Sequence, residues 1–139
     1  MGKEQCISFL TEHGIKPTAN RIVIAETLAS ADCPMSVKEL EYRILSIDKS
    51  NIFRTLMLFK EHHLVHVIED GDGGLKYELC LSHDHNVDED EHLHFFCERC
   101  HKTICLHEIP VPIISLPAGY ELRGISCVVK GLCPKCRKQ

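Results

Sequence analysis

The sequence lacks several features that would each point to a particular class of protein. It has no apolar run near the roughly 20 residues that cross a bilayer, and Met1 to Gln5 lack the basic and apolar regions of a secretion signal. It has no glycine-serine or proline-rich tract either, so we expect a folded, cytoplasmic protein without a membrane partner. Positive charge is also scarce, with a formal net charge of -4. Any DNA binding must therefore come from a local surface and not from bulk charge.

Sulfur and imidazole side chains are abundant instead. The 139 residues include 9 cysteines and 10 histidines. The reducing cytoplasm does not favour a disulfide framework, so these residues indicate metal binding or redox chemistry. A chain of this length forms one domain, or two small ones if a metal adds stability.

Two C-x-x-C pairs are the most specific motif. Their members are Cys97, Cys100, Cys133 and Cys136. Four thiolates at this spacing can hold one tetrahedral zinc ion with bonds of about 2.3 Å. Such a closed shell leaves no position for a water molecule, so it predicts a structural site without catalysis. The alternatives are redox pairs, which would need a βαβ setting, or cysteines without a ligand.

A second group of possible ligands is more scattered. His92 and His94 alternate on an expected strand, which would direct both imidazoles to the same side. The further members are His66, Cys80, Glu78 and Cys105. A mixed nitrogen and sulfur site suits zinc. Taken singly, Cys80 or Cys105 is more often a small buried apolar residue, and His66 is more often a surface histidine. Glu78 is also compatible with a solvated strand residue.

Three segments of the N-terminal half have helical apolar spacing and a capping residue at the start. They run from Thr18 to about Ser30, from Ser36 to about Ser46, and from Asp48 to about His62. Serine, threonine and aspartate accept a hydrogen bond from the first turn of a helix. Glu39, three residues after Ser36, completes a capping-box pattern. We therefore expect three helices.

An alternating pattern follows these helices. Leu64 to Glu69 and Leu75 to Leu79 flank a glycine-rich turn and predict a β-hairpin. Three helices and a hairpin form a winged helix-turn-helix domain, which we place at residues 1–81.

The acidic segment from Ser82 to Glu91 is expected to be a hinge or exposed loop. Beyond it, residues 92–139 predict a small zinc-stapled α/β domain. Its expected strands cover His94 to Phe96, Thr103 to Cys105 and Gly124 to Val129, and prolines interrupt the segment between the last two. The predicted fold class is α+β.

The third helix carries candidate DNA contacts. Arg54 could bind a phosphate or a guanine, and Phe53 could contact thymine methyl groups. Together with a residue of the first helix, the candidates are Arg21, Lys49, Asn51, Phe53 and Arg54. On this evidence alone, the alternative of a solvated helix face with Phe53 packed into the core is favoured.

The motifs resemble those of the ferric uptake regulator superfamily of bacterial repressors, over residues 14–136. Residues 14–21 look like the family's opening G-x-x-x-T-x-x-R, and residues 52–56 look like its V-Y-R-T-L recognition helix. Residues 92–100 are similar to its hinge and first zinc knuckle, and residues 131–136 to its last. The resemblance implies a C-terminal dimerisation domain and a homodimer that binds a double-stranded palindromic operator once a regulatory metal is bound.

Within the superfamily, the chain looks most like the zinc uptake regulators. That resemblance implies regulatory ligands at His66, Cys80, His92 and His94, with zinc as the sensed metal and no small-molecule substrate. Pro34 and Cys105 stand where iron- and peroxide-sensing branches place a histidine and an acidic ligand. A thiolate favours zinc over iron. Ile109 to Pro117 replaces the long helix usual in the dimerisation domain.

The expected function is a zinc-responsive repressor of metal-uptake genes. The nearest rival is an iron- or peroxide-sensing member of the same superfamily, and a redox switch through Cys80 or Cys105 is a third reading. From another class, a zinc hydrolase could use His92, His94 and Cys80 as ligands, with Glu78 as the base. A zinc-ribbon interaction module is a further alternative. Neither explains the N-terminal half, so we expect no enzyme.

Overall fold

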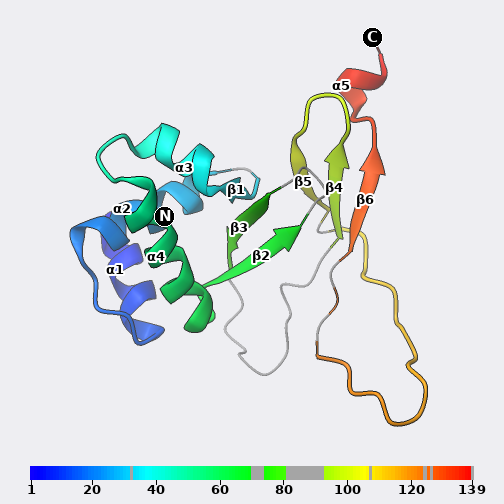
Figure 1. Cartoon of the computed structure of the whole chain (residues 1–139), viewed down its shortest axis with the longest axis horizontal. Coiled ribbons are helices and arrows are strands. Elements are labelled where there is room, and N and C mark those ends of the chain that lie inside the picture. The colour runs from blue at the N-terminus through cyan, green and yellow to red at the C-terminus, as the bar shows by residue number, and fades with distance from the viewer. Residues whose placement is uncertain are drawn as a thin grey trace. The chain divides into compact units, whose positions relative to one another are not determined.

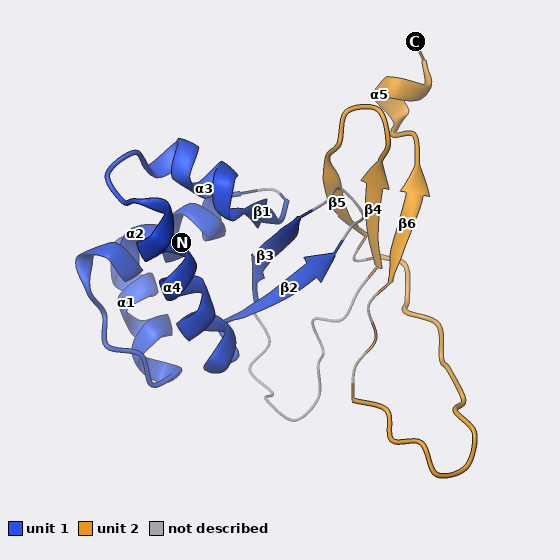
Figure 2. Cartoon of the chain, in the orientation of Figure 1, with its two compact units in different colours: residues 1–81 blue, residues 82–139 orange. Residues whose placement is uncertain are grey.

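The computed structural model describes residues 1–31, 33–69, 74–80, 93–106, 108–123, 125 and 127–138. It divides into two units, residues 1–81 (unit 1) and 82–139 (unit 2), coloured separately in Figure 2. The expected hinge at residues 82–91 and His92 lie outside the described residues. Among the described helices, none has the length and apolar character needed to cross a membrane.

Unit 1 combines a helical bundle with a small sheet (Figure 1). In chain order its elements are α1 (Lys3–Glu12), α2 (Ala19–Ser30), β1 (Met35–Ser36), α3 (Val37–Ile44), α4 (Lys49–Glu61), β2 (Val65–Glu69) and β3 (Leu75–Leu79). The strands lie in the order β1-β3-β2, and both neighbours of β3 pair with it antiparallel. The predicted helices and hairpin are confirmed, and they form the expected winged helix-turn-helix arrangement.

The helix starts follow from local capping. Thr18 Oγ1 accepts a hydrogen bond from the backbone N–H of Arg21 at 3.3 Å, and Ser36 Oγ accepts one from Glu39 at 3.1 Å. Asp48 occupies the N-cap of α4 as predicted, but its carboxylate accepts no backbone hydrogen bond. It accepts one from the side-chain amide of Asn51 instead. The prediction of the helix was therefore right, and that of its capping bond wrong.

The core of unit 1 draws side chains from every helix and from the sheet. Among those with no exposed area are Leu10, Ile24, Leu40, Leu56 and Phe59. Tyr77, at the centre of β3, is 1% exposed and lies opposite both Met35 and Val67. This core fixes α4 against α2 and α3 and leaves the opposite side of α4 in solvent.

Helix α1 was not predicted. It buries Cys6, Phe9 and Leu10, which follow the i, i+3, i+4 spacing of an amphipathic helix. The apolar pattern was therefore present in the sequence, without a side-chain cap to mark its start.

Unit 2 is built on a second three-stranded sheet. Its elements are β4 (Leu93–Cys97), β5 (Thr103–Leu106), β6 (Val128–Gly131) and the single-turn helix α5 (Pro134–Arg137). The strand order is β5-β4-β6, with β4 antiparallel to β5 and parallel to β6. The last strand lies further along the chain than the predicted range of 124–129. Register explains the difference, because Val128 to Gly131 are the residues that lie beside His94 to Cys97.

Candidate metal centres and nucleic-acid interface

The four cysteines of the two C-x-x-C pairs come together at one end of the second sheet. The Sγ atoms of Cys97, Cys100, Cys133 and Cys136 all lie within 4.8 Å of one another. Cys100 Sγ and Cys133 Sγ are 3.9 Å apart. A tetrahedral zinc site with bonds of about 2.3 Å requires sulfur atoms about 3.8 Å apart, so the donor set has the spacing that zinc needs.

Backbone geometry holds the two pairs in place. Cys97 ends β4, and the turn after it leads through Cys100 to β5. Cys133 is the N-cap of α5, and Pro134 suits the first turn, where a missing N–H breaks no hydrogen bond. Two further bonds join the pairs: Glu98 N–H donates to Gly131 at 2.8 Å, and Arg99 Nη1 donates to the Cys136 carbonyl at 2.9 Å.

The thiols differ in their readiness to ionise. Backbone N–H groups of Cys100 and Cys133 donate to the sulfur of Cys97 and lower its pKa to about 5. The backbone N–H of Cys136 likewise lowers the pKa of Cys133. Burial, together with the neighbouring thiols, raises the pKa of Cys136 to about 12. Two of the four groups therefore favour the thiolate, which is the form that binds metal.

Part of the second ligand group lies on the hairpin of unit 1. His66 on β2 and Glu78 on β3 are directly opposite in the register, and His66 Nε2 lies 3.2 Å from Glu78 Oε2. Both side chains are mostly buried, with 24% and 20% exposed. Cys80 follows two residues after Glu78, is half-buried, and donates its N–H to the Leu64 carbonyl at 2.7 Å. A carboxylate beside a histidine can ligate a metal or orient the imidazole that does.

Another part lies within unit 2. His94 on β4 and Cys105 on β5 are register partners, so their side chains share one face of the sheet. His94 is 7% exposed and Cys105 is half-buried, and their ligand atoms lie within 4.8 Å of each other. The backbone N–H of His94 donates to the Cys127 carbonyl at 3.1 Å.

Helix α4 divides into a buried and an exposed face. Ile52, Leu56 and Phe59 face the core, whereas Lys49, Asn51, Phe53 and Arg54 are exposed. Phe53 has 47% of its surface exposed and does not belong to the core cluster. The alternative in which Phe53 packs into the core is therefore wrong. An aromatic ring beside exposed cationic and amide groups suits a nucleic-acid contact.

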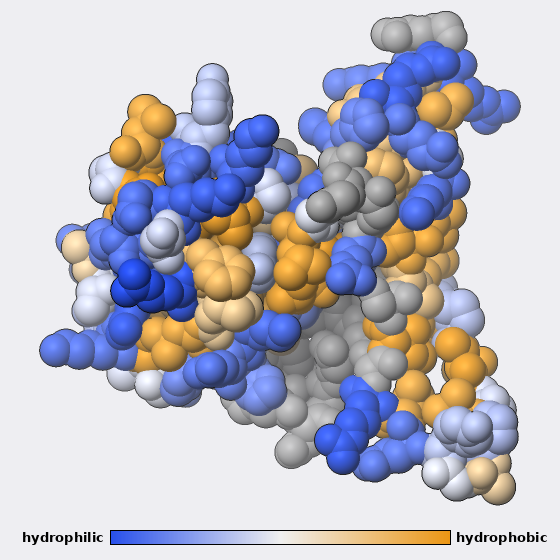
Figure 3. Space-filling view, in the orientation of Figure 1, coloured by the Kyte–Doolittle hydropathy of each residue, from blue (hydrophilic) through white to orange (hydrophobic). Residues whose placement is uncertain are grey.

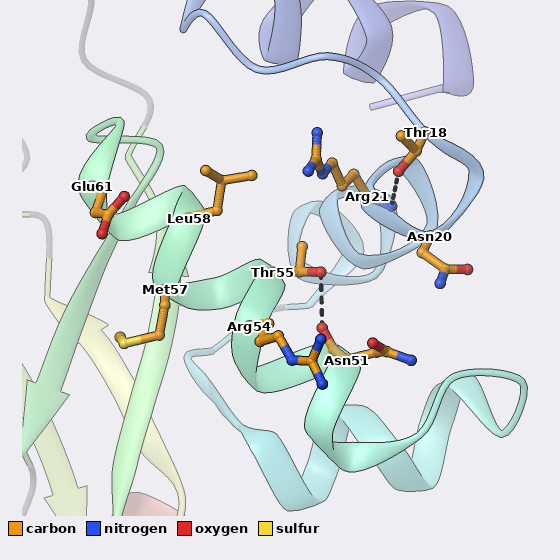
Figure 4. Close-up of a pocket in the computed structure, with 9 residues that line it drawn as sticks. All are labelled: Thr18, Asn20, Arg21, Asn51, Arg54, Thr55, Met57, Leu58 and Glu61. Atoms are coloured by element: carbon orange, nitrogen blue, oxygen red, sulfur yellow. Dashed lines mark hydrogen bonds between the residues drawn. The ribbon is translucent and has the colours of Figure 1, made fainter.

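Arg21 and Arg54 line the same open hollow between α2 and α4 (Figure 4). The hollow has a volume of about 490 Å³. Its complete lining consists of Thr18, Asn20, Arg21, Asn51, Arg54, Thr55, Met57, Leu58 and Glu61. A hydrogen bond restricts the side chain of Arg21, because its Nη1 donates to the Lys16 carbonyl at 3.0 Å. Two guanidinium groups with neighbouring amides and hydroxyls match the chemistry of a phosphate.

The hollow adds residues that the sequence did not single out for this role. Thr18 was predicted only as a helix cap, and Asn20 was not predicted at all. Both precede the first core residue of α2, in the exposed first turn. Arg21 of the opening motif was the signal from which these two residues could have been predicted, because residues within one helical turn of Arg21 lie close to it.

Comparison with known proteins agrees with this architecture. The ferric uptake regulator family model matches residues 12–115. The chain is 29% identical to the ferric uptake regulation protein of Campylobacter jejuni, over 98% of this chain and 88% of that protein. It is 22% identical to the peroxide operon regulator of Bacillus subtilis, over 98% and 94%.

Solved structures show the same fold. The Helicobacter pylori ferric uptake regulator aligns with a TM-score of 0.68 at 16% identity, covering 100% of this chain and 96% of that one. The family match spans most of the chain, including α4 and the first cysteine pair. The chain therefore belongs to the ferric uptake regulator family, whose members are metal-dependent, DNA-binding transcription regulators and not enzymes.

Proposed function

We propose that this protein is a cytoplasmic, homodimeric repressor of metal-uptake genes that binds a palindromic operator when zinc fills a regulatory site. A structural zinc ion at Cys97, Cys100, Cys133 and Cys136 would hold unit 2 together. The regulatory ligands would be His66, Cys80, His92 and His94, with Glu78 and Cys105 as further members.

The structural role follows from the donor set. Four thiolates fill a tetrahedral zinc ion completely and leave it no open position. Such a shell binds too firmly to report changes in supply, so sensing belongs to the other ligands. Zinc at the regulatory site would act by charge and coordination alone, since it has no redox chemistry.

The distribution of the remaining ligands is the observation that carries the proposal. Unit 1 presents His66 beside Glu78, and unit 2 presents His94 beside Cys105. A metal ion that needs four donors is satisfied by neither pair alone. We infer that the ion takes ligands from both units and so selects one arrangement of them. That arrangement would set the spacing of the two recognition helices of the dimer on the operator.

The choice of zinc over iron rests on sulfur. Cys80 and Cys105 are the cysteines among the proposed ligands, and thiolates favour zinc, whereas iron sites of this type use carboxylates and imidazoles. Iron or peroxide sensing is the second candidate. It is favoured by Glu78, whose carboxylate already lies 3.2 Å from His66.

Titration of the purified protein tests the metal. With the structural site filled, zinc should raise operator affinity at lower free concentration than iron(II). Cys80→Ser combined with His92→Ala should remove that response. His63→Asn is the matched control, because His63 is exposed and has φ 60°, a conformation that asparagine tolerates.

The results separate the candidates. Zinc-dependent binding that survives the double substitution refutes the ligand assignment. A response to iron(II) at lower concentration than to zinc refutes zinc sensing and supports the second candidate.

Arg54→Ala tests the DNA-binding face. Loss of a base contact should weaken operator binding by about 1–3 kcal/mol, whereas loss of a phosphate contact should weaken all sequences alike. Lys60→Ala, near the other end of α4, is the control and should change little. Unchanged operator binding by the Arg54 variant would remove α4 from the DNA interface.

A further inference from the structure

Two polar side chains at the start of α4 are joined by a hydrogen bond that fixes the orientation of one of them. The side-chain amide of Asn51 donates to the carboxylate of Asp48, three residues earlier in the chain. Both residues are exposed. Asp48 occupies the N-cap of α4, yet its side chain accepts no hydrogen bond from the backbone of the helix. The carboxylate is therefore engaged by a side chain and not by the first turn of α4.

The chemistry of this pair determines which end of the amide faces outward. A carboxylate accepts hydrogen bonds and does not donate them, so the atom of Asn51 that faces Asp48 must be the amide nitrogen Nδ2. The carbonyl oxygen Oδ1, at the other end of the planar amide group, then points away from the carboxylate. Nδ2 keeps one further N–H. Asn51 therefore presents one acceptor and one donor side by side.

Asn51 belongs to the exposed face of α4 that the proposed function places on DNA. It lines the hollow between α2 and α4 together with Arg54, its neighbour on the next turn (Figure 4). Blue, hydrophilic residues lie next to orange, hydrophobic ones over α4 in Figure 3. Base edges in the major groove offer hydrogen-bonding atoms and thymine methyl groups, which match this mixture. In helix-turn-helix proteins the first residues of the recognition helix contact base edges, and Asn51 lies in the first turn of α4.

We propose that Asn51 reads an adenine in the major groove of each half of the operator, and that Asp48 is the positioning residue that imposes this choice. Adenine presents the acceptor N7 beside the donor N6, which matches the N–H and the Oδ1 of Asn51. Guanine presents two acceptors, N7 and O6, so Oδ1 would face an acceptor with no hydrogen between them. This inference rests on the DNA-binding face of the proposed function and assigns a base to one of its residues.

The hydrogen bond between Asp48 and Asn51 gains importance when DNA is bound. In solution, water competes for both side chains, so the bond by itself contributes little. In a groove from which water is displaced, an unpaired carboxylate is costly, and a hydrogen bond to it is stronger. A flip of the Asn51 amide to suit guanine would turn Oδ1 toward the carboxylate and leave both groups unpaired. The pair therefore disfavours guanine through a residue that need not touch the base.

Selection from random-sequence duplex DNA tests the base preference. Full-length, zinc-loaded wild-type protein should enrich adenine at one position of each half-site, and Asn51→Ala should lose the enrichment at that position alone. Fluorescence anisotropy then measures the effect of replacing this adenine by guanine in one half-site. The change should weaken wild-type binding by about 5- to 150-fold more than it weakens binding by the Asn51→Ala variant. Selection of the same sequence by both proteins would overturn the proposal.

Asp48→Asn separates positioning from helix capping. Asparagine and aspartate are similarly good N-caps, and the two side chains have nearly the same shape. An amide at this position donates as well as accepts, so it pairs with Asn51 in either orientation and no longer opposes guanine. The preference for adenine over guanine should therefore fall by about fivefold or more, the value of one hydrogen bond. An unchanged preference would refute the role of Asp48.

Glu12→Gln is the matched control for the loss of charge. It also removes one exposed carboxylate from unit 1, at the end of α1. Removal of a negative charge changes the affinity for all DNA sequences alike, so this variant should keep the wild-type preference for adenine over guanine. An equal fall of the preference in Glu12→Gln and Asp48→Asn would show that net charge, and not the orientation of Asn51, is the cause, and would overturn the proposal.

The outcomes distinguish this inference from the proposed function. If Arg54→Ala weakens operator binding but Asn51→Ala leaves the selected sequence unchanged, α4 still contacts DNA and the reading of adenine by Asn51 is refuted. If both variants bind as the wild-type protein does, the DNA-binding face of α4 and the assignment to Asn51 fail together.

Discussion

Removal of the structural metal should unfold unit 2 and leave unit 1 intact. Among the described residues of unit 2, the buried apolar side chains are three of the four cysteines, with Phe95 packed against them, and Leu93 and Phe96, whereas unit 1 buries side chains from α1 to β3. Structural zinc contributes about 10–16 kcal/mol to small zinc domains at pH 7, and whole domains are stable by about 5–15 kcal/mol. The two quantities are of the same size, so we expect loss of the ion to remove most or all of the free energy of unfolding of unit 2.

Hydrogen exchange with and without a strong zinc chelator measures this directly. After zinc is stripped, the backbone amides of β4 and β6 should lose protection, while those of α2, α4 and β3 keep theirs. Cys136→Ser should have the same effect without chelator. Cys127→Ser, at a half-buried cysteine of the same unit outside the four ligands, should retain both zinc and protection.

One result would refute the reasoning. If the amides of β4 and β6 exchange as slowly in metal-free protein as in zinc-loaded protein, the four thiols do not stabilise unit 2 through an ion. The fold of unit 2 would then depend on packing that the described residues do not display.

Three further predictions concern unit 1 and are checked by chemical denaturation. Burial raises the pKa of Tyr77. The stabilisation from its neutral phenol is therefore fully present below the ordinary pKa of 10.0 and is lost as the pH rises through the higher pKa of the folded state. Tyr77→Phe should make the alkaline loss of stability shallower, and an unchanged loss would show that Tyr77 is not its cause. Leu56→Ala removes a fully buried side chain and should cost about 2–5 kcal/mol. Ser36→Ala should lower the free energy of unfolding by about 1 kcal/mol, and Asp48→Ala by clearly less, because of these two caps only Ser36 accepts a backbone N–H. Equal losses would show that the capping bond is not the cause.

The helix-turn-helix region was predictable because its signals are local. Thr18 and Ser36 cap helices within three residues of themselves, and the apolar spacing of α4 identifies its buried face without knowledge of the rest of the fold. The assembly of Cys97 with Cys133 is a long-range contact. It was nevertheless predictable, because the chemistry of zinc restricts which cysteine pairs can share an ion.

Other features depend on contacts that a sequence pattern does not encode. The position of β6 is set by its parallel register with β4 and by the cysteines that follow it, so apolar alternation around Cys127 placed the strand too early. The cap of α4 failed because Asn51 competes for the carboxylate of Asp48. The helix pattern alone favoured packing of Phe53 into the core, because an aromatic residue beside a buried isoleucine fits that face, and the structure exposes it.

The parallel pairing of β4 with β6 also determines when a newly synthesised chain can bind its structural metal. During synthesis, β4, the first cysteine pair and β5 leave the ribosome before residues 109–122, β6 and α5. Two thiolates alone hold zinc weakly, so firm capture must wait until Cys133 and Cys136 have returned to Cys97. Contacts between such distant residues form slowly. Doubling the length of the loop between β5 and β6 adds only about 0.6 kcal/mol to the free energy of closing it. This loop can therefore change in length and sequence while the metal site stays the same.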